Sequence, residues 1–248
     1  MAPHTRVGIF GVNGKMGTEV CRAVQRADGL DLIAGVDLGD PLDQAERSQV
    51  IVDFTHPDVV MEHIQWCIER GINCVVGTTG FTPERLDQVR GWLADAPEVG
   101  VVIASNFSIG AVLMMQFAAK ASRYFPSVEI IELHHPNKAD APSGTAGTTA
   151  GIIAAARADA GMGPVPDATS GDDTSRGLEV DGIRVHSVRL QGLVAHQEVL
   201  LGATGETLSI RHDSFERVSF MPGVIEAVRY VADHPGLTIG IEAVLGLE

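Results

Sequence analysis

Two adjacent histidines and a lysine stand close together near the middle of the chain, at His134, His135 and Lys138. Histidine exchanges a proton near neutral pH and a lysine ammonium carries a full positive charge, so these side chains can transfer protons and attract an anion. The run Ser143–Thr145 follows and can start a helix, whose first backbone N–H groups bind carboxylate or phosphate oxygens. Together these residues predict a site for an anionic ligand, with proton transfer as its chemistry.

The elements on either side of this segment indicate how it is held. Val128 to Leu133 is an apolar run typical of a buried strand, and Thr145 to Ala160 is an alanine-rich stretch expected to form a helix. The polar loop therefore joins the end of a strand to the start of a helix. A metal site at His134 and His135 is a weaker interpretation, because adjacent side chains diverge and no nearby Cys or Glu completes an obvious ligand set. We expect no metal.

A second candidate site lies near the start of the chain, where an apolar run over 6–10 ends in a glycine-rich loop. Gly11, Gly14 and Gly17 have the spacing GxxGxxG, and a helical pattern follows them. The order of strand, glycine loop and helix is typical of folds that bind dinucleotides, although the usual spacing is GxGxxG. A plain tight turn would account for the loop if it stood alone.

The next apolar run, Leu30 to Val36, ends at Asp37, about 20 residues beyond the last glycine, where an acid can meet the ribose hydroxyls of an adenosine. Leu38 and Gly39 follow, so no arginine stands beside the acid to hold a 2′-phosphate. This indicates that NADH is acceptable, while Lys15 in the glycine loop can still reach a phosphate.

Strand and helix patterns alternate through the first part of the chain, with strands expected over 49–54, 73–76 and 99–104 and helices over 57–70 and 83–94. Such alternation predicts an α/β fold with a Rossmann-like, doubly wound parallel sheet that binds ligands at the carboxyl ends of its strands. Two of these ends carry small and hydroxyl residues that let a flat ring approach the backbone. They are the segments Gly77-Thr78-Thr79-Gly80 and Ala104-Ser105-Asn106-Phe107. Ordinary strand-to-helix turns would look much the same.

The second part of the chain has a different pattern. A long apolar helix is expected over 109–125 and a flexible loop over 161–177, followed by strands over 183–190, 196–201 and 206–213. No helix separates these strands, so we expect them to be antiparallel neighbours in a sheet whose free face packs against another subunit. A final helix over 214–232, interrupted near 221–223, and a strand over 237–244 are expected to return to the first domain.

Composition excludes several classes of partner. The 248 residues carry Lys+Arg 18 against Asp+Glu 32, a formal charge of -14, which disfavours nucleic acid and anionic membranes. No apolar run reaches the roughly 18 residues of a membrane span and the first ten residues do not resemble a signal peptide, so we expect a cytoplasmic protein. Cys21, Cys67 and Cys74 lack C-x-x-C spacing and are expected to be core thiols.

The chain resembles the dihydrodipicolinate reductases of lysine and diaminopimelate biosynthesis, now described as 4-hydroxy-tetrahydrodipicolinate reductases. The segments that carry the resemblance are GVNGKMG (11–17), GTTGF (77–81), ASNFSIG (104–110) and above all ELHHPNKADAPSGTA (132–146). The glycine loop is shared by many dehydrogenases, whereas the last segment is highly specific. The resemblance covers essentially the whole chain.

The resemblance implies a cofactor domain over 1–107 and 216–248. Between its two parts it implies an inserted α+β domain over 108–215, built on a mixed, largely antiparallel sheet, that binds substrate and forms a homotetramer. It also implies reduction of 4-hydroxy-tetrahydrodipicolinate with NADH or NADPH. Cofactor contacts are expected by matching positions at Gly11, Val12, Asn13, Gly14, Lys15, Met16, Asp37, Gly77, Thr78, Thr79, Ala104, Ser105, Asn106 and Phe107.

The same matching makes His134 and Lys138 the catalytic pair, and it places the substrate contacts at His135, Ser143, Gly144 and Thr145. The substrate would be a cyclic imine with two carboxylates. After hydride addition, Lys138 is the candidate proton donor to the ring, and His134 is a candidate general acid or base.

Two other classes stay open at this point. One is another two-domain nicotinamide dehydrogenase that acts on an amino-acid precursor. A semialdehyde dehydrogenase would need an active-site cysteine, and a short-chain dehydrogenase would need Tyr-x-x-x-Lys, whereas Val128 and His234 follow Tyr124 and Tyr230 at that spacing. The other class is a non-catalytic dinucleotide sensor, which would not need His134 and Lys138.

Overall fold

The computed structural model describes residues 4–170 and 174–247. The chain folds into two units, each with its own sheet. Unit 1 comprises Met1–Ile109 and Arg217–Glu248, and unit 2 comprises Gly110–Glu216. Positions 171–173 of the loop predicted over 161–177 lie outside the described residues, and the short 3-10 helix η2 (Thr174–Arg176) follows them.

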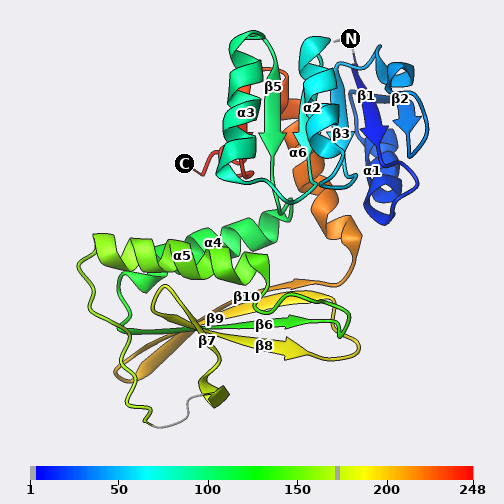
Figure 1. The fold of residues 1–248 in the computed structure, drawn as a ribbon. Helices are drawn as coiled ribbons and strands as arrows, with labels where there is room; N and C mark the ends of the chain where they lie inside the picture. Colours follow the sequence, from blue (N-terminus) through cyan, green and yellow to red (C-terminus); the bar gives the residue numbers. More distant parts are fainter. Residues whose placement is uncertain (1–3, 171–173, 248) are drawn as a thin grey trace. The chain divides into compact units, whose positions relative to one another are not determined.

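Unit 1 is built on a six-stranded sheet in the order β11-β5-β4-β3-β1-β2, in which every neighbouring pair is parallel (Figure 1). Its strands are β1 (Thr5–Phe10), β2 (Leu30–Val36), β3 (Val50–Asp53), β4 (Asn73–Val76), β5 (Gly100–Ile103) and β11 (Gly236–Ile239). The central strands β3 and β5 are buried at every position. Apart from Asp53 at the end of β3, these strands carry the near-continuous apolar runs that are typical where helices cover both faces of a parallel sheet.

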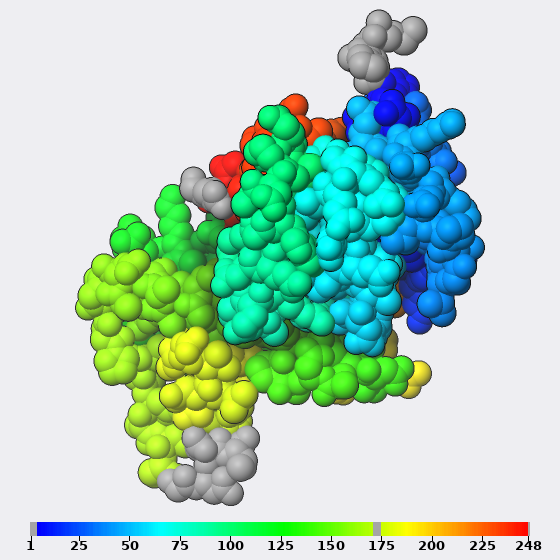
Figure 2. All heavy atoms as spheres, turned by 45° about the horizontal axis from the view of Figure 1, so that its top comes forward, coloured from blue at the N-terminus to red at the C-terminus, as the bar shows by residue number. Residues whose placement is uncertain are grey.

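The described residues of this unit form the α-helices that cover the sheet: α1 (Lys15–Arg26), α2 (Val60–Glu69), α3 (Pro83–Ala94) and α6 (Met221–Val231). Helix α1 packs against α6 on one face, and α2 packs against α3 on the other. Figure 2 shows α2 and α3 side by side as one continuous surface, in cyan and blue-green. The 3-10 helices η1 (Leu42–Ala45) and η3 (Arg217–Phe220) complete the unit.

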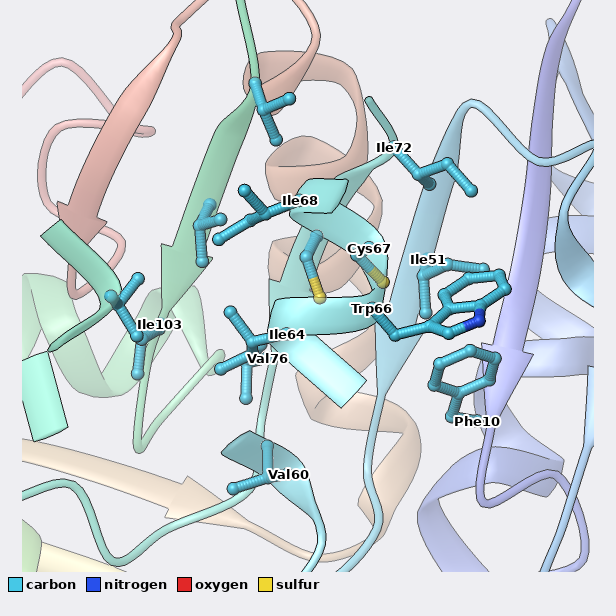
Figure 3. Packing of buried hydrophobic residues seen from close by; sticks show 14 of the residues in the cluster. Phe10, Ile51, Val60, Ile64, Trp66, Cys67, Ile68, Ile72, Val76 and Ile103 are labelled. Carbon is cyan, nitrogen blue, oxygen red and sulfur yellow. The ribbon is translucent and has the colours of Figure 1, made fainter. Parts of the chain in front are cut away.

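The core beneath α2 joins helix and strand side chains (Figure 3). Phe10 at the end of β1 meets Trp66 of α2 edge to face, with ring centroids 5.8 Å apart. Cys67 and Cys74 are fully buried in this cluster, whereas Cys21 is only partly buried. Each large apolar side chain removed from water contributes about 1.5–3 kcal/mol, so this cluster fixes α2 against the sheet.

The order of the strands reverses between β1 and β3, because the chain adds β2 on one side of β1 and β3 to β5 on the other. In doubly wound sheets the loops at such a point diverge and leave a crevice beyond the carboxyl ends of the strands. The glycine loop that follows β1 lies at this point.

Unit 2 carries helices α4 (Ile109–Ser122) and α5 (Gly144–Asp159) on one face of a five-stranded sheet. The strand order is β10-β9-β6-β8-β7, and only the pair of β6 and β8 is parallel. The bounds are β6 (Ser127–His134), β7 (Leu178–Val180), β8 (Ile183–Arg189), β9 (Ala195–Ala203) and β10 (Glu206–Ser214). The predicted fold class, a parallel doubly wound sheet plus a mixed and largely antiparallel one, is confirmed.

One part of the predicted pairing is wrong. The strands expected over 183–190 and 196–201 are not neighbours, because β6 lies between β8 and β9 and pairs with both. The segment after β8 crosses the end of β6, where the Leu190 N–H donates to the His134 carbonyl at 3.0 Å. Helix α5 belongs to the crossover that makes β6 and β8 parallel, and this long connection gave no local sign of the pairing.

Two boundaries also differ from prediction near the chain end. The helix expected over 214–232 is the 3-10 turn η3 followed by α6, and Ser214 is still in β10. The strand expected over 237–244 ends at Ile239, because Gly240 adopts a φ of +82° that turns the chain. The short strand β7 was not predicted, because it directly follows the segment expected to be a loop.

Candidate active site

Strand β6 places Glu132 and His134 on the same face of the sheet of unit 2, because side chains alternate along a strand. Val128 and Ile130 precede them on this face and are buried. The Glu132 side chain is 0% exposed, and that of His134, at the end of the strand, is 13% exposed. A charged residue therefore occupies a core position directly beside the predicted site.

Several hydrogen-bond donors surround the Glu132 carboxylate. Both terminal nitrogens of Arg189 donate to it, each at 2.8 Å, and the backbone N–H of Ser143 donates at 3.1 Å. Nδ1 of His134 lies 2.5 Å from Oε2. Because an ionised carboxylate only accepts hydrogen bonds, His134 carries its proton on Nδ1 and keeps Nε2 as the basic nitrogen.

Opposing effects act on these two groups. Burial alone would raise the pKa of Glu132, but the hydrogen bonds from Arg189, Ser187 and His134 outweigh it and hold that pKa below its ordinary value. Burial lowers the pKa of His134, and the bond to Glu132 opposes this effect without overcoming it. His134 is therefore predominantly a neutral imidazole at neutral pH, held in one tautomer by a carboxylate.

Arg189 reaches this site through the pairing of strands rather than through proximity in sequence. It ends β8, and the parallel register sets it opposite His134 at the end of β6. One of its terminal nitrogens also donates to the backbone carbonyl of Asp140 at 2.6 Å. The guanidinium thus ties the loop after β6 to the buried Glu132.

Lys138 lies in the turn that follows, where its N–H donates to the His135 carbonyl at 3.2 Å. Its ammonium donates to both carboxylate oxygens of Asp140, at 2.8 and 2.9 Å. This hydrogen bond lowers the pKa of Asp140, with a smaller contribution from the Gly144 backbone N–H. A carboxylate of the chain itself therefore meets the same ammonium and helix N-terminus that the sequence assigns to an anionic ligand.

Helix α5 begins as the sequence predicts. Ser143 is its N-cap, and the hydroxyl accepts from the Ala146 N–H at 3.2 Å. A Cβ built on Gly144 would meet nothing within 4 Å, so packing within the chain does not require glycine there. A bare backbone at the first helical position lets a ligand approach its N–H closely. His135, in the loop that precedes this helix, is exposed.

The glycine loop of unit 1 is closely packed against its own helix. Gly11 has a φ of +80°, and a Cβ on Gly17 would lie 2.0 Å from the Gly11 carbonyl oxygen. Lys15 begins α1 and is exposed, with Val12, Asn13 and Met16 around it. Only glycine fits where the helix start approaches the strand end this closely, which is the arrangement that presents N–H groups to a diphosphate.

A cavity of about 580 Å³ opens beside this loop. Gly11, Gly14 and Asp37 line it together with residues of the β2–η1 and β3–α2 connections. One oxygen of Asp37 accepts from the Asn13 N–H at 2.6 Å, so the acid and the glycine loop are joined. The loop, the acid and the cavity fit the adenosine half of a dinucleotide.

The other predicted cofactor residues lie at the same edge of the sheet but do not line this cavity. Gly77, Thr78 and Thr79 follow β4, and a Cβ on Gly77 would lie 2.0 Å from the Phe54 ring. Ala104 to Phe107 follow β5, where Ala104 and Phe107 are buried, Ser105 is exposed and Asn106 accepts from the Ser108 N–H at 2.8 Å.

Two features of the sites were not predicted from sequence. Glu132 lies inside the specific segment 132–146 but had no role in the prediction, although a single acid in an apolar strand is a usable signal. Arg189 had no local signal at all. Among the described residues no group of three or more His, Cys, Asp or Glu side chains could hold a metal ion, and no helix is long and apolar enough to cross a bilayer.

Comparison with known proteins agrees with this geometry. Residues 5–107 match the family model described as dihydrodipicolinate reductase, N-terminus, and residues 110–245 match its C-terminus. The chain is 61% identical over 245 residues to 4-hydroxy-tetrahydrodipicolinate reductase of Nocardia farcinica, covering 98% of this chain and 99% of the relative. It is 60% identical over 244 residues to the enzyme of that name from Cutibacterium acnes, with the same coverage.

A solved structure, dipicolinate-bound dihydrodipicolinate reductase from Paenisporosarcina sp. TG-14, is similar with a TM-score of 0.85 and 39% identity. The match covers 97% of this chain and 99% of that one. The family predicted from the motifs is therefore confirmed, and the chain belongs to the dihydrodipicolinate reductases.

Proposed function

We propose that this protein reduces 4-hydroxy-tetrahydrodipicolinate to tetrahydrodipicolinate with a nicotinamide cofactor, in the formation of diaminopimelate and lysine. The observation that carries the proposal is the loop between β6 and α5, where Lys138 and the start of α5 already hold one carboxylate, that of Asp140. Relatives that match almost the whole chain are named 4-hydroxy-tetrahydrodipicolinate reductase. The relative solved with dipicolinate bound supports a cyclic dicarboxylate as the ligand.

Groups of unit 2 are proposed to bind the substrate, which carries two carboxylates. The backbone N–H groups of Gly144 and Thr145, with the Ser143 cap, are proposed to hold one carboxylate, since the start of a helix favours negative charge. The Lys138 ammonium would exchange Asp140 for substrate, and the exposed His135 would donate to a carboxylate oxygen. A dicarboxylate thus meets positive potential in a protein that is otherwise strongly acidic.

Proton transfer is assigned to Lys138 and His134. The substrate loses its hydroxyl as water, and hydride addition to the conjugated ring then leaves an electron pair that must take a proton at the neighbouring carbon. Lys138 is proposed to donate this proton, and the neutral Nε2 of His134 to accept or relay a proton as a general base. Glu132 and Arg189 act on the reaction by holding His134 in one tautomer.

The cofactor, when bound, supplies the hydride. The glycine loop 11–16 and Asp37 are proposed to hold its diphosphate and ribose, and the turns 77–79 and 104–107 its nicotinamide half. The cavity beside the glycine loop is lined by four acids, Asp37, Asp40, Asp58 and Glu62. None of the described residues that line it is Lys or Arg. A 2′-phosphate meets four acids there, so we propose that NADH is used in preference to NADPH.

A homotetramer built on unit 2 is also proposed. Leu200 of β9 and Leu208 of the neighbouring edge strand β10 are 36% and 38% exposed. Another subunit that packs on this sheet would cover these apolar side chains. Light scattering after size exclusion should give a mass of four chains.

The reaction is tested by a coupled assay. Dihydrodipicolinate synthase generates the unstable substrate from pyruvate and aspartate semialdehyde, and loss of nicotinamide absorbance is followed with NADH and NADPH separately. We expect oxidation only in the complete mixture, competitive inhibition by dipicolinate and a faster rate with NADH. Cofactor binding without oxidation would contradict the proposal and favour a dinucleotide sensor.

A further inference from the structure

Unit 1 contains a buried carboxylate that the proposed reaction does not use. Asp53 ends β3 and its side chain is 0% exposed. One oxygen accepts from the Thr55 N–H at 2.8 Å, the Thr55 hydroxyl at 2.6 Å and the Thr78 hydroxyl at 3.2 Å. The other oxygen faces Nδ1 of His63 at 2.7 Å. A buried carboxylate is costly unless its oxygens are satisfied, and here donors from three residues meet that cost.

His63 is fixed by this pair. It lies on α2 with a side chain that is 14% exposed, and its ring meets the Phe10 ring edge to face at 5.0 Å. Since the Asp53 carboxylate accepts a hydrogen bond from Nδ1–H, the neutral imidazole presents the lone pair of Nε2. No described residue bonds Nε2. Both the tautomer and the ring orientation are therefore set by Asp53.

His63 also lines the cavity beside the glycine loop, together with Gly11, Gly14 and Asp37. The residues near it that can carry charge are its partner Asp53, Glu62 on the same helix, His56 and Asp58 on the preceding loop, and Asp37 and Asp40, which also line the cavity. His56 pairs with Asp58 at 3.1 Å, and both side chains are largely exposed. His63 is thus the nearly buried, rigidly held histidine of this wall.

We propose that His63 is a cofactor-binding residue that accepts a hydrogen bond at Nε2 from the adenosine half of the dinucleotide, and that Asp53 is its positioning residue. This rests on the proposed function, because it assumes that a nicotinamide dinucleotide occupies the cavity. The adenine amino group and the ribose hydroxyls are the donors of that half, and either would meet an acceptor whose direction is fixed in advance. Preorganisation of this kind removes the entropic cost of ordering the side chain on binding.

The alternative is that the pair only fastens α2 to β3. Substitutions at His63 separate the two roles, because asparagine resembles the Nδ1 side of the ring and glutamine reaches the position of Nε2. His63→Asn keeps a donor for Asp53 and loses the cavity acceptor. His63→Gln returns an amide oxygen to the cavity.

The experiment is titration calorimetry of the full chain with NADH and with ADP-ribose, which lacks the nicotinamide. We expect His63→Asn to weaken both ligands about tenfold, the effect of one lost hydrogen bond, and His63→Gln to stay within about threefold of the wild type. The matched control is His4→Asn, which alters an exposed pair with Asp31 at the other end of β1, and should leave both affinities unchanged.

A second measurement does not depend on a variant folding. The imidazole ¹⁵N resonance of His63 Nε2 in the wild type should shift when ADP-ribose is added. Equal affinities in the wild type and His63→Asn, or an unmoved Nε2 resonance with ligand bound, would overturn this inference alone. Failure of the wild type to bind NADH would overturn the proposed cofactor and this inference with it.

Discussion

The two units each contain a histidine held through Nδ1 by a fully buried carboxylate, but the carboxylates differ in their other partners. Glu132 of unit 2 is shared between His134 and the guanidinium of Arg189. Asp53 of unit 1 has, within the described part of the chain, only threonine donors besides His63. The histidine side chains are almost equally shielded, with 13% and 14% exposed.

This difference between the partners of Glu132 and Asp53 fits the different roles proposed for His134 and His63. With Arg189 satisfying the charge of Glu132, burial dominates and the pKa of His134 is lowered, which leaves a base that can exchange a proton. Among the described residues, Asp53 meets neutral donors, and no guanidinium or ammonium shares its carboxylate with His63. In the roles proposed above, the shared carboxylate of Glu132 orients a group that reacts, and the unshared carboxylate of Asp53 orients a group that binds.

The largest effect that separates the two regions is expected at Lys138. Lys138→Ala should lower kcat about 10²- to 10⁴-fold, the range for loss of a positioned proton donor, while NADH affinity stays unchanged. Lys138→Arg keeps the positive charge but does not release a proton, so it should preserve KM better than kcat. Steady-state kinetics in the coupled assay checks both, and near-normal turnover of Lys138→Ala would contradict the assignment.

The shared carboxylate is tested by removing its cation. Arg189→Met should lower the free energy of unfolding by about 3 kcal/mol, because Glu132 stays buried without its bidentate partner. The double variant Glu132→Gln/Arg189→Met should recover much of this loss. Urea denaturation measures both, and Arg211→Met, which breaks an exposed ion pair with Asp213, should cost less than about 1 kcal/mol. Equal costs for Arg189 and Arg211 would remove the distinction between the pairs.

The same contrast explains what sequence reasoning found and missed. The glycine loop, Asp37 and the Ser143 cap are local: each depends on residue types within a few positions, and the structure places each at the expected strand or helix end. Arg189 depends on β6 and β8 being parallel neighbours across a long crossover, which no local pattern encodes. The prediction that β8 pairs with β9 failed for that reason.

Asp53 and His63 were missed for a different reason. Ten residues separate them, and the bond exists because α2 folds back over β3 from a turn at 54–59. The strand was predicted as an apolar run, and no role was predicted for Asp53 at its end.

A smaller loss is expected at the unshared carboxylate. Asp53→Asn should lower the free energy of unfolding by about 1–3 kcal/mol, because an amide donor would face the Nδ1–H of His63 and force the other tautomer. NADH affinity should fall as well, since Nε2 would then carry the proton. His63→Asn keeps the bond to Asp53 and should be less destabilising in the same urea titration. The reverse order would mean that the histidine, rather than the carboxylate, organises this pair.

The smallest effect concerns pH. The pKa of His134 is lowered in the folded chain, so around the ordinary histidine pKa of about 6.5 the unfolded chain binds more protons. The stability from this difference is fully present above that pH and is lost as pH falls through the lowered folded pKa. Urea titrations at pH 8 and pH 5 should therefore show a smaller advantage of wild type over His134→Asn at pH 5. In an Arg189→Met background the pH dependence should weaken, because the guanidinium no longer disfavours the imidazolium. An advantage larger at pH 5 than at pH 8 would show that Glu132 holds a charged His134, and an advantage equal at the two pH values would contradict the lowered pKa of His134.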